Sequence, residues 1–143
     1  MTRKTKALFL CTGNSARSQI GEAMLRRHAG DQFEVHSAGL EPSVINPFTV
    51  RVLEEVGIDT SQQHAKPLST YMGNTHFGYL ITVCSKAEEK CPIFPGMGVR
   101  MHWPFEDPAA FQGSDEEKLA KFREVRDLIE ARVKEWVQEI SDD

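Results

Sequence analysis

A cysteine and an arginine, separated by five residues, stand in the stretch Cys11-Thr12-Gly13-Asn14-Ser15-Ala16-Arg17-Ser18. An apolar run leads into this stretch and a helical pattern leads out of it, which predicts a short loop between a strand and a helix. The backbone N–H groups of such a loop and the N-terminus of the helix favour negative charge at one point. An arginine fork can bind two oxygens of the same anion. The stretch from Thr12 to Ser18 is therefore the predicted binding site for a tetrahedral oxyanion.

Cys11 is the predicted nucleophile of this site. The positive groups that attract an anion also lower the pKa of a neighbouring thiol, so the thiolate would lie beside its electrophile. Each residue taken alone has a structural alternative. A cysteine that ends a buried strand is often a small core residue, and Gly13-Asn14 is an ordinary turn signal. The complete pattern, with Ser18 after Arg17, favours the phosphate-binding loop.

The length and charge of the chain limit its class. The 143 residues are enough for a packed core and predict a single domain over residues 1–143. No apolar run reaches the length of a membrane span or of a signal peptide, so we expect a cytoplasmic protein with no membrane partner. The formal net charge of −4 argues against a nucleic-acid partner. An anionic substrate must then be captured by a local positive site.

The cysteines favour redox chemistry over a structural framework. Their number, three, is odd, which argues against a secreted disulfide scaffold. Disulfides in a reducing compartment are usually transient and catalytic. The sequence has no C-x-x-C pair, and its five histidines are scattered without the spacing of ligands, so no metal site is predicted.

Strand and helix signals alternate along the chain and predict an α/β fold. Strands are expected over residues 6–10, 33–37, 78–83 and 99–103, and helices over residues 18–28, 47–57 and after a capping box at 114–117. This alternation implies right-handed connections and a parallel sheet flanked by helices. We expect a doubly wound sheet of four strands in the order 2-1-3-4. Ligands of such sheets bind at the carboxyl ends of the strands. Cys11 and Cys84 end neighbouring strands in this order and should therefore lie side by side.

The last helix carries a stripe of apolar residues at helical spacing, which predicts core packing. Its members are Leu119, Phe122, Val125, Leu128, Ile129, Val133 and Trp136.

Cys91 follows Cys84 in a short, charged segment. A disulfide needs Cα atoms within about 7 Å, so the segment would have to unwind or loop out before the two thiols could join. Its polar composition makes such a motion cheap. The alternative is a buried Cys84 and an incidental Cys91, and spacing alone does not choose between them. The nearby oxyanion loop favours the redox interpretation, because it gives the thiols an oxidant.

Asp107 is the predicted general acid. It follows the fourth expected strand, in Trp103-Pro104-Phe105-Glu106-Asp107-Pro108, and so lies near the carboxyl edge of the sheet. A carboxyl that faces an anion in a partly apolar loop tends towards a raised pKa, which suits proton donation. The alternatives are that Asp107 only caps a turn, or that Glu106 supplies the proton. The pattern favours Asp107 as the acid.

These stretches together resemble the thioredoxin-coupled arsenate reductases, which share the fold of the low-molecular-weight protein tyrosine phosphatases. The resemblance covers nearly the whole chain. It is carried by Cys11 to Ser18, by Ser37-Ala38-Gly39, by Cys84 with Cys91-Pro92, and by His102-Trp103 with Asp107-Pro108-Ala109.

The resemblance implies that the protein reduces arsenate to arsenite. Arsenate binds in the loop as a phosphate mimic, and phosphate or sulfate can occupy the same place. Cys11 attacks arsenic while Asp107 protonates the departing oxygen, and Ser18 hydrogen-bonds the thiolate. Cys84 then attacks Cys11 and releases arsenite. Cys91 attacks Cys84, and reduced thioredoxin regenerates the looped-out disulfide.

The resemblance also bears on bound ions. It implies that Asn14 and Ser15 hold the loop. Some members bind potassium through positions that match Asn14, Glu22 and Ser37 and a further acidic residue. Lys66 stands at the acidic position here, and we hypothesise that its ammonium replaces the cation; the alternative is a bound potassium ion. No bound cofactor is then expected, and thioredoxin is the electron donor.

Two other functions compete with the reductase. A tyrosine phosphatase would use Cys11, Arg17 and Asp107 alone. Such phosphatases usually have aromatic residues after the Asp-Pro pair, whereas Ala109-Ala110 follow here, so only weak phosphatase activity is expected. A thiol redox sensor or an oxyanion-binding module would keep the cysteines but would not need Asp107.

Overall fold

The computed structural model describes residues 4–73, 75–84, 87, 89 and 97–141. Its strands are β1 (Thr5–Cys11), β2 (Phe33–Gly39), β3 (Phe77–Thr82) and β4 (Met97–His102). Its α-helices are α1 (Arg17–Ala29), α2 (Pro47–Glu54) and α4 (Asp115–Ser141), and its 3-10 helices are η1 (Leu68–Thr70) and η2 (Pro108–Ala110). Within the described ranges, no helix combines the length and the apolar character needed to cross a membrane.

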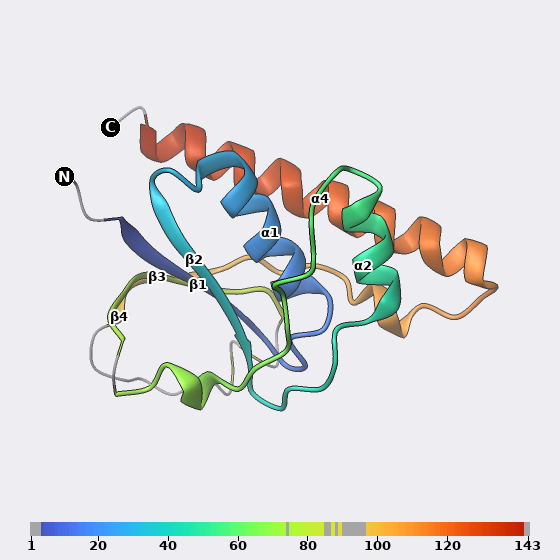
Figure 1. Ribbon diagram of the computed structural model, residues 1–143, viewed down its shortest axis with the longest axis horizontal. Coiled ribbons are helices and arrows are strands. Elements are labelled where there is room, and N and C mark those ends of the chain that lie inside the picture. Colours follow the sequence, from blue (N-terminus) through green and yellow to red (C-terminus); the bar gives the residue numbers. More distant parts are fainter. Residues whose placement is uncertain (1–3, 74, 85–86, 88, 90–96, 142–143) are drawn as a thin grey trace.

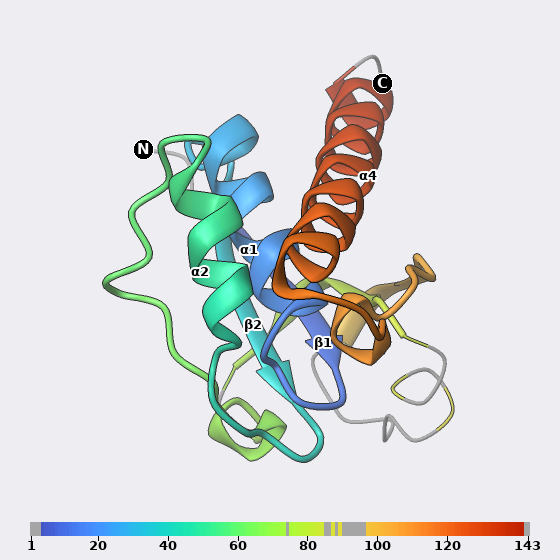
Figure 2. The ribbon, with the colours of Figure 1, turned by 90° about the vertical axis from the view of Figure 1, so that its right-hand side faces the viewer.

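The four strands form a parallel sheet in the order β2-β1-β3-β4, which confirms the predicted topology. The register aligns Cys11 of β1 with Gly39 of β2, and Leu10 of β1 with Thr82 of β3. The strands therefore end together, and Figure 2 shows the arrowheads of β1 and β2 at the same lower end of the molecule. A site built at the carboxyl edge can draw on the loops after β1, β2, β3 and β4.

Helix α1 packs closely against β1. A Cβ atom at Gly21 would lie 2.6 Å from the ring of Phe9, so the helix can pack at this distance only with glycine there. The helix begins at Arg17 and ends at Ala29, just before Gly30, close to the predicted bounds. The contact between Gly21 and Phe9 holds α1 against the carboxyl-terminal half of β1.

Helix α4 begins with the predicted capping box. The Ser114 N–H donates to Glu117 Oε1, and the Glu117 N–H donates to Ser114 Oγ, both at 3.1 Å. The buried members of the apolar stripe are Leu119, Phe122, Val125, Ile129, Val133 and Trp136. The prediction for Leu128 was wrong, since that residue is 54% exposed. Neighbours on a helix diverge by about 100°, and Ile129 occupies the position that faces the core.

Helix α2 is shorter than predicted and is tied to the loop after β1. It ends at Glu54, and Gly57 lies in the following turn with φ = 82°. Its N-cap residue, Asn46, accepts a hydrogen bond from the Phe48 N–H through its side chain. The Asn46 N–H itself donates to the Ser15 carbonyl. The N-terminus of α2 is therefore hydrogen-bonded to the loop after β1 and helps to fix its conformation.

Arg126 joins α4 to α2, and Figure 1 shows α4 running along both α1 and α2. The buried Arg126 guanidinium donates to the Val52 carbonyl at 2.9 Å and to Glu55 Oε1 at 3.1 Å. Arg123, one turn earlier and on the surface, bonds the same carboxylate and holds the pKa of Glu55 below its usual value. The two arginines share this carboxylate but differ in burial, and Arg126 also holds the Val52 carbonyl.

This difference predicts unequal effects on stability. The substitution Arg126→Met should lower the free energy of unfolding by about 2 kcal/mol, because the Val52 carbonyl at this buried position loses its donor. Arg123→Met is the matched control and should cause a much smaller loss, since water can replace an exposed partner. Urea denaturation followed by circular dichroism measures both. Equal losses would contradict the role of burial.

Candidate active site

The predicted nucleophile lies at the end of β1, in a hydrogen-bonded chain of three side chains. Cys11 is buried, and its Sγ lies 3.1 Å from Ser18 Oγ. Asn14 Nδ2 donates to the same hydroxyl at 2.7 Å. Because the amide occupies an acceptor position of the Ser18 oxygen, the hydroxyl proton is left to face the sulfur. This arrangement gives the Cys11 sulfur a hydrogen-bond donor inside the loop.

The backbone carbonyls of the loop between β1 and α1 bond outwards, away from its centre. Most of the donors are backbone N–H groups of residues 40–46, the segment that follows β2 and runs beside the loop in Figure 2. The N–H groups of Leu40, Glu41, Ser43 and Asn46 bond to the carbonyls of Cys11, Thr12, Gly13 and Ser15 at 2.8 to 3.1 Å. A trans peptide points its N–H opposite to its carbonyl. By that geometry the N–H groups turn towards the centre of the loop, an arrangement that can bind an anion.

Asn14 lies in the loop with a positive φ. It is fully buried and has a φ of 51°, in the left-handed region that asparagine tolerates better than most residues. Its carbonyl accepts a hydrogen bond from Gln19 Nε2 at 3.0 Å. Its side-chain oxygen accepts another from the Lys66 N–H at 3.0 Å. Together with the bond to Ser18, these contacts engage the backbone carbonyl and the side-chain amide of Asn14 and keep the residue in this conformation.

Arg17 and Asp107 face each other at the carboxyl edge. Arg17 Nη1 donates to the Phe105 carbonyl at 3.1 Å, and Nη2 lies 3.7 Å from Asp107 Oδ2. The other oxygen of Asp107 accepts from the Ala109 N–H and caps η2. Asp107 thus has the turn-capping contact of the structural alternative and, with its second oxygen, faces the loop arginine. Glu106 pairs instead with Lys121 on the surface.

The structure brings Cys84 to the rim of the same loop. This residue follows β3 and is buried, and its Sγ lies 3.5 Å from Thr12 Oγ1. The Ala87 N–H donates to the sulfur at 3.4 Å. Cys11 and Cys84 are both free thiols. Cys91, the third predicted thiol, lies outside the described residues.

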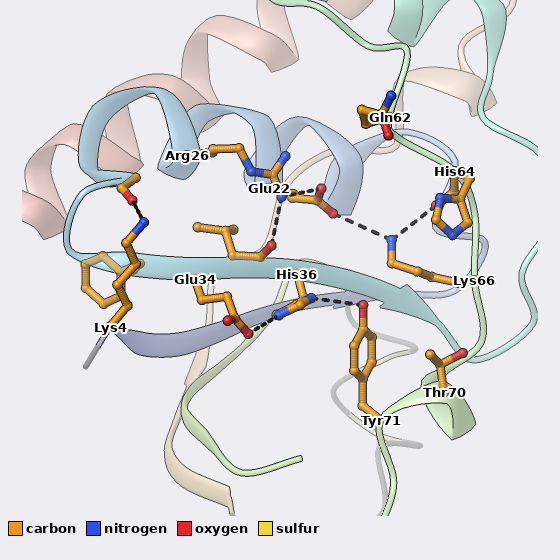
Figure 3. A pocket seen from close by; sticks show the side chains of 13 residues that line it. Lys4, Glu22, Arg26, Glu34, His36, Gln62, His64, Lys66, Thr70 and Tyr71 are labelled. Atoms are coloured by element: carbon orange, nitrogen blue, oxygen red, sulfur yellow. Dashed lines mark hydrogen bonds and ion pairs between the residues drawn. The ribbon is translucent and has the colours of Figure 1, made fainter. Parts of the chain in front are cut away.

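Beside the loop, an ion pair borders a cavity of about 610 Å³ that runs along β2 (Figure 3). Figure 3 shows Lys66 pointing towards Glu22, and its Nζ lies 3.7 Å from Glu22 Oε1. The buried Glu22 carboxylate also accepts from Ser37 Oγ and from Arg26 Nη2. Burial lowers the pKa of Lys66, and Glu22 opposes this effect. Each group stabilises the other, because a buried charge without a partner carries a large desolvation cost.

These contacts do not suit a bound potassium ion. The oxygens of Glu22 and Ser37 lie within 3.7 Å and 3.4 Å of the Lys66 ammonium, and the Asn14 side-chain oxygen is bonded to the Lys66 N–H. A second cation there would meet the ammonium at close range. Among the described residues, no three His, Cys, Asp or Glu side chains come together as a metal site.

Sequence reasoning missed two parts of this site. The segment 40–46 acts through its backbone N–H groups, which have no signature in the side chains. Gln19 was hidden in an ordinary helical pattern, although it is fully buried and bonded to Asn14. A glutamine on the buried face of a helix is unusual, and this was the available signal.

Comparisons with known proteins agree on a family. The model of the low molecular weight phosphotyrosine protein phosphatase family matches residues 6–143. The arsenate reductase of Bacillus subtilis (strain 168) is 44% identical over 130 residues, which cover 91% of this chain and 93% of the relative. The arsenate reductase of Halalkalibacterium halodurans is 42% identical, with the same coverage of both chains.

Solved structures give the same result. An arsenate reductase in the phosphate binding state superposes with a TM-score of 0.79 at 30% identity, covering 95% of this chain and 98% of that one. The thioredoxin-dependent arsenate reductase of Corynebacterium glutamicum has a TM-score of 0.73 at 31% identity and covers 98% of this chain and 63% of its own. Sequence and structure therefore agree that the chain belongs to the low molecular weight phosphotyrosine protein phosphatase family and, within it, to the arsenate reductases, which are enzymes.

Proposed function

We propose that this protein, as a single domain over residues 1–143, reduces arsenate to arsenite with electrons from reduced thioredoxin. The observation that carries the proposal is the buried Cys84 thiol at the rim of the Cys11 loop, 3.5 Å from the Thr12 hydroxyl. Hydrolysis of a phosphate ester at Cys11 needs no second thiol, whereas a transfer of two electrons to arsenic does. Relatives that are arsenate reductases, one of them thioredoxin-dependent, support this reading.

In the first step, the Cys11 thiolate attacks the arsenic of arsenate bound in the loop. The inward N–H groups and the Arg17 guanidinium neutralise the anion, and Ser18 stabilises the thiolate until it reacts. An arsenic–oxygen bond breaks as the sulfur–arsenic bond forms. Asp107 gives its proton to the departing oxygen, which leaves as water. Phosphate and sulfate have the same tetrahedral shape and compete for the loop.

In the second step, the Cys84 thiolate attacks the Cys11 sulfur. The sulfur–sulfur bond forms, and the electron pair of the sulfur–arsenic bond passes to arsenic, which leaves as arsenite. Cys91 then attacks Cys84, which forms a Cys84–Cys91 disulfide and releases Cys11 as a thiolate. The dithiol of thioredoxin reduces that disulfide. A cycle that needs a reduced thiol partner fits a reducing compartment, which favours the cytoplasm.

The relay can be tested by steady-state turnover. NADPH consumption is measured with arsenate, thioredoxin and thioredoxin reductase. Wild type should turn over steadily. Cys84→Ser and Cys91→Ser should lose turnover, because neither variant can form the Cys84–Cys91 disulfide that thioredoxin reduces. Hydrolysis of p-nitrophenyl phosphate is the control and should survive in both variants, since it needs neither thiol. Without arsenate-dependent turnover in wild type, that hydrolysis would identify the protein as a phosphatase.

The role of Asp107 separates an enzyme from a thiol sensor. Asp107→Asn should lower arsenate turnover by about a hundred-fold or more, because the oxygen then leaves without a proton. Binding of inorganic phosphate should persist, since the loop and Arg17 are intact. Glu106→Gln is the matched control and should turn over like wild type, because Glu106 faces Lys121 on the surface. Normal turnover of Asp107→Asn would remove Asp107 from the mechanism.

The Lys66–Glu22 pair predicts that turnover does not depend on potassium. Arsenate turnover should be the same in potassium chloride as in choline chloride at equal ionic strength, because the Lys66 ammonium already neutralises Glu22. Matching the ionic strength controls for general screening of the anionic substrate. A clear rise in turnover with potassium would show that a cation still binds there.

A further inference from the structure

Gln19 is a buried polar residue that the proposed steps do not use. Its side chain lies in the first turn of α1 and is fully buried. Both hydrogens of its amide are engaged, since Nε2 donates to the Asn14 carbonyl at 3.0 Å and to the His64 carbonyl at 2.9 Å. Its Oε1 accepts from Gln63 Nε2 at 3.0 Å. A buried amide whose nitrogen and oxygen are both hydrogen-bonded is held in a single orientation.

The carbonyl that Gln19 binds is held differently from its neighbours. The carbonyls of Gly13 and Ser15 on either side each accept a backbone N–H from residues 40–46. Ser15 has a second donor as well, the hydroxyl of the buried Thr49 at 2.9 Å. At Asn14, the donor that the structure provides is the side chain of Gln19. The middle of the loop therefore depends on a side chain where its flanks depend on the backbone.

We infer that Gln19 is a positioning residue, which aims the Ser15 N–H at the bound oxyanion by holding the Asn14 carbonyl outwards. The carbonyl and the next N–H belong to one planar trans peptide and point in opposite directions. Asn14 keeps a left-handed φ of 51°, a conformation that relaxes when its contacts are removed. Relaxation would turn the peptide and withdraw the N–H from the anion. This inference rests on the proposed function, because it assumes that the loop binds an oxyanion.

The test replaces the amide with a side chain of similar length that has no donor. In Gln19→Met, phosphate should bind about ten-fold more weakly, as expected when one preorganised donor to an anion is lost. Binding is measured as protection of Cys11 from iodoacetamide by inorganic phosphate, and the labelled peptide is identified by mass spectrometry. The KM for arsenate should rise in parallel.

Thr49→Val is the matched comparison, because it removes a buried donor from the neighbouring carbonyl without changing the shape of the side chain. The Ser15 carbonyl keeps its bond from Asn46, so phosphate affinity should change far less than in Gln19→Met. Thermal unfolding is recorded for both variants. If both lose affinity in proportion to their loss of stability, or if Gln19→Met binds phosphate like wild type, the inference is overturned.

A measurement on the unmodified protein covers the case in which Gln19→Met fails to fold. In a phosphate titration followed by NMR, the Ser15 amide and the Gln19 side-chain amide should shift with the same midpoint. A Gln19 signal that stays still while Ser15 moves would overturn the inference. Absence of protection and of shifts in the wild type would instead count against the proposed oxyanion site itself, and Gln19 would lose its role with it.

Discussion

The site depends on the outward hydrogen bonding of the carbonyls in the loop between β1 and α1. An anion can be bound by a bare backbone only if several N–H groups converge, and they converge here because their carbonyls are engaged elsewhere. Residues 40–46 can reach those carbonyls because Cys11 and Gly39 are aligned in the parallel register of β1 and β2. The close approach of Gly39 matters as well, since a Cβ there would lie 2.8 Å from the Thr12 carbonyl. The sheet thus shapes the proposed anion site directly.

Buried charge beside the loop follows from the same construction. Asn14 needs a partner for its side-chain oxygen, and the Lys66 N–H provides it, which brings the Lys66 side chain next to Glu22. A carboxylate as deeply buried as Glu22 must be paired, and Arg26 and Lys66 pair it from two sides. The positive charges that offset the burial of Glu22 therefore come from side chains of the protein itself. This explains why the residues at this place fit an ion pair better than a bound cation.

Much of the fold could be predicted because its signals are local. The capping box at Ser114, the helix stop at Gly30 and the alternation of strands and helices each depend on a few neighbouring residues, and this alternation predicts a parallel sheet. Leu128 was misjudged, because which side of a helix faces the core is decided by distant packing. Helix α2 ends at Glu54, before the turn that contains Gly57. For the site, the loop residues and Cys84 could be found from their types. The donors from residues 40–46 could not be found in this way, since every residue except proline has a backbone N–H.

The placement of Cys84 connects the architecture to the choice between reduction and hydrolysis. The order of the sheet makes β3 the neighbour of β1, so the residue after β3 meets the loop after β1. A side chain at that point can contact the loop without entering the anion site, and Cys84 does so through Thr12. A hydrolase must keep the way to its phosphoenzyme open to water, whereas a reductase must bring a second sulfur to the first. The same fold can therefore serve either reaction, and in the proposed relay the thiol that follows β3 supplies the second sulfur that reduction requires.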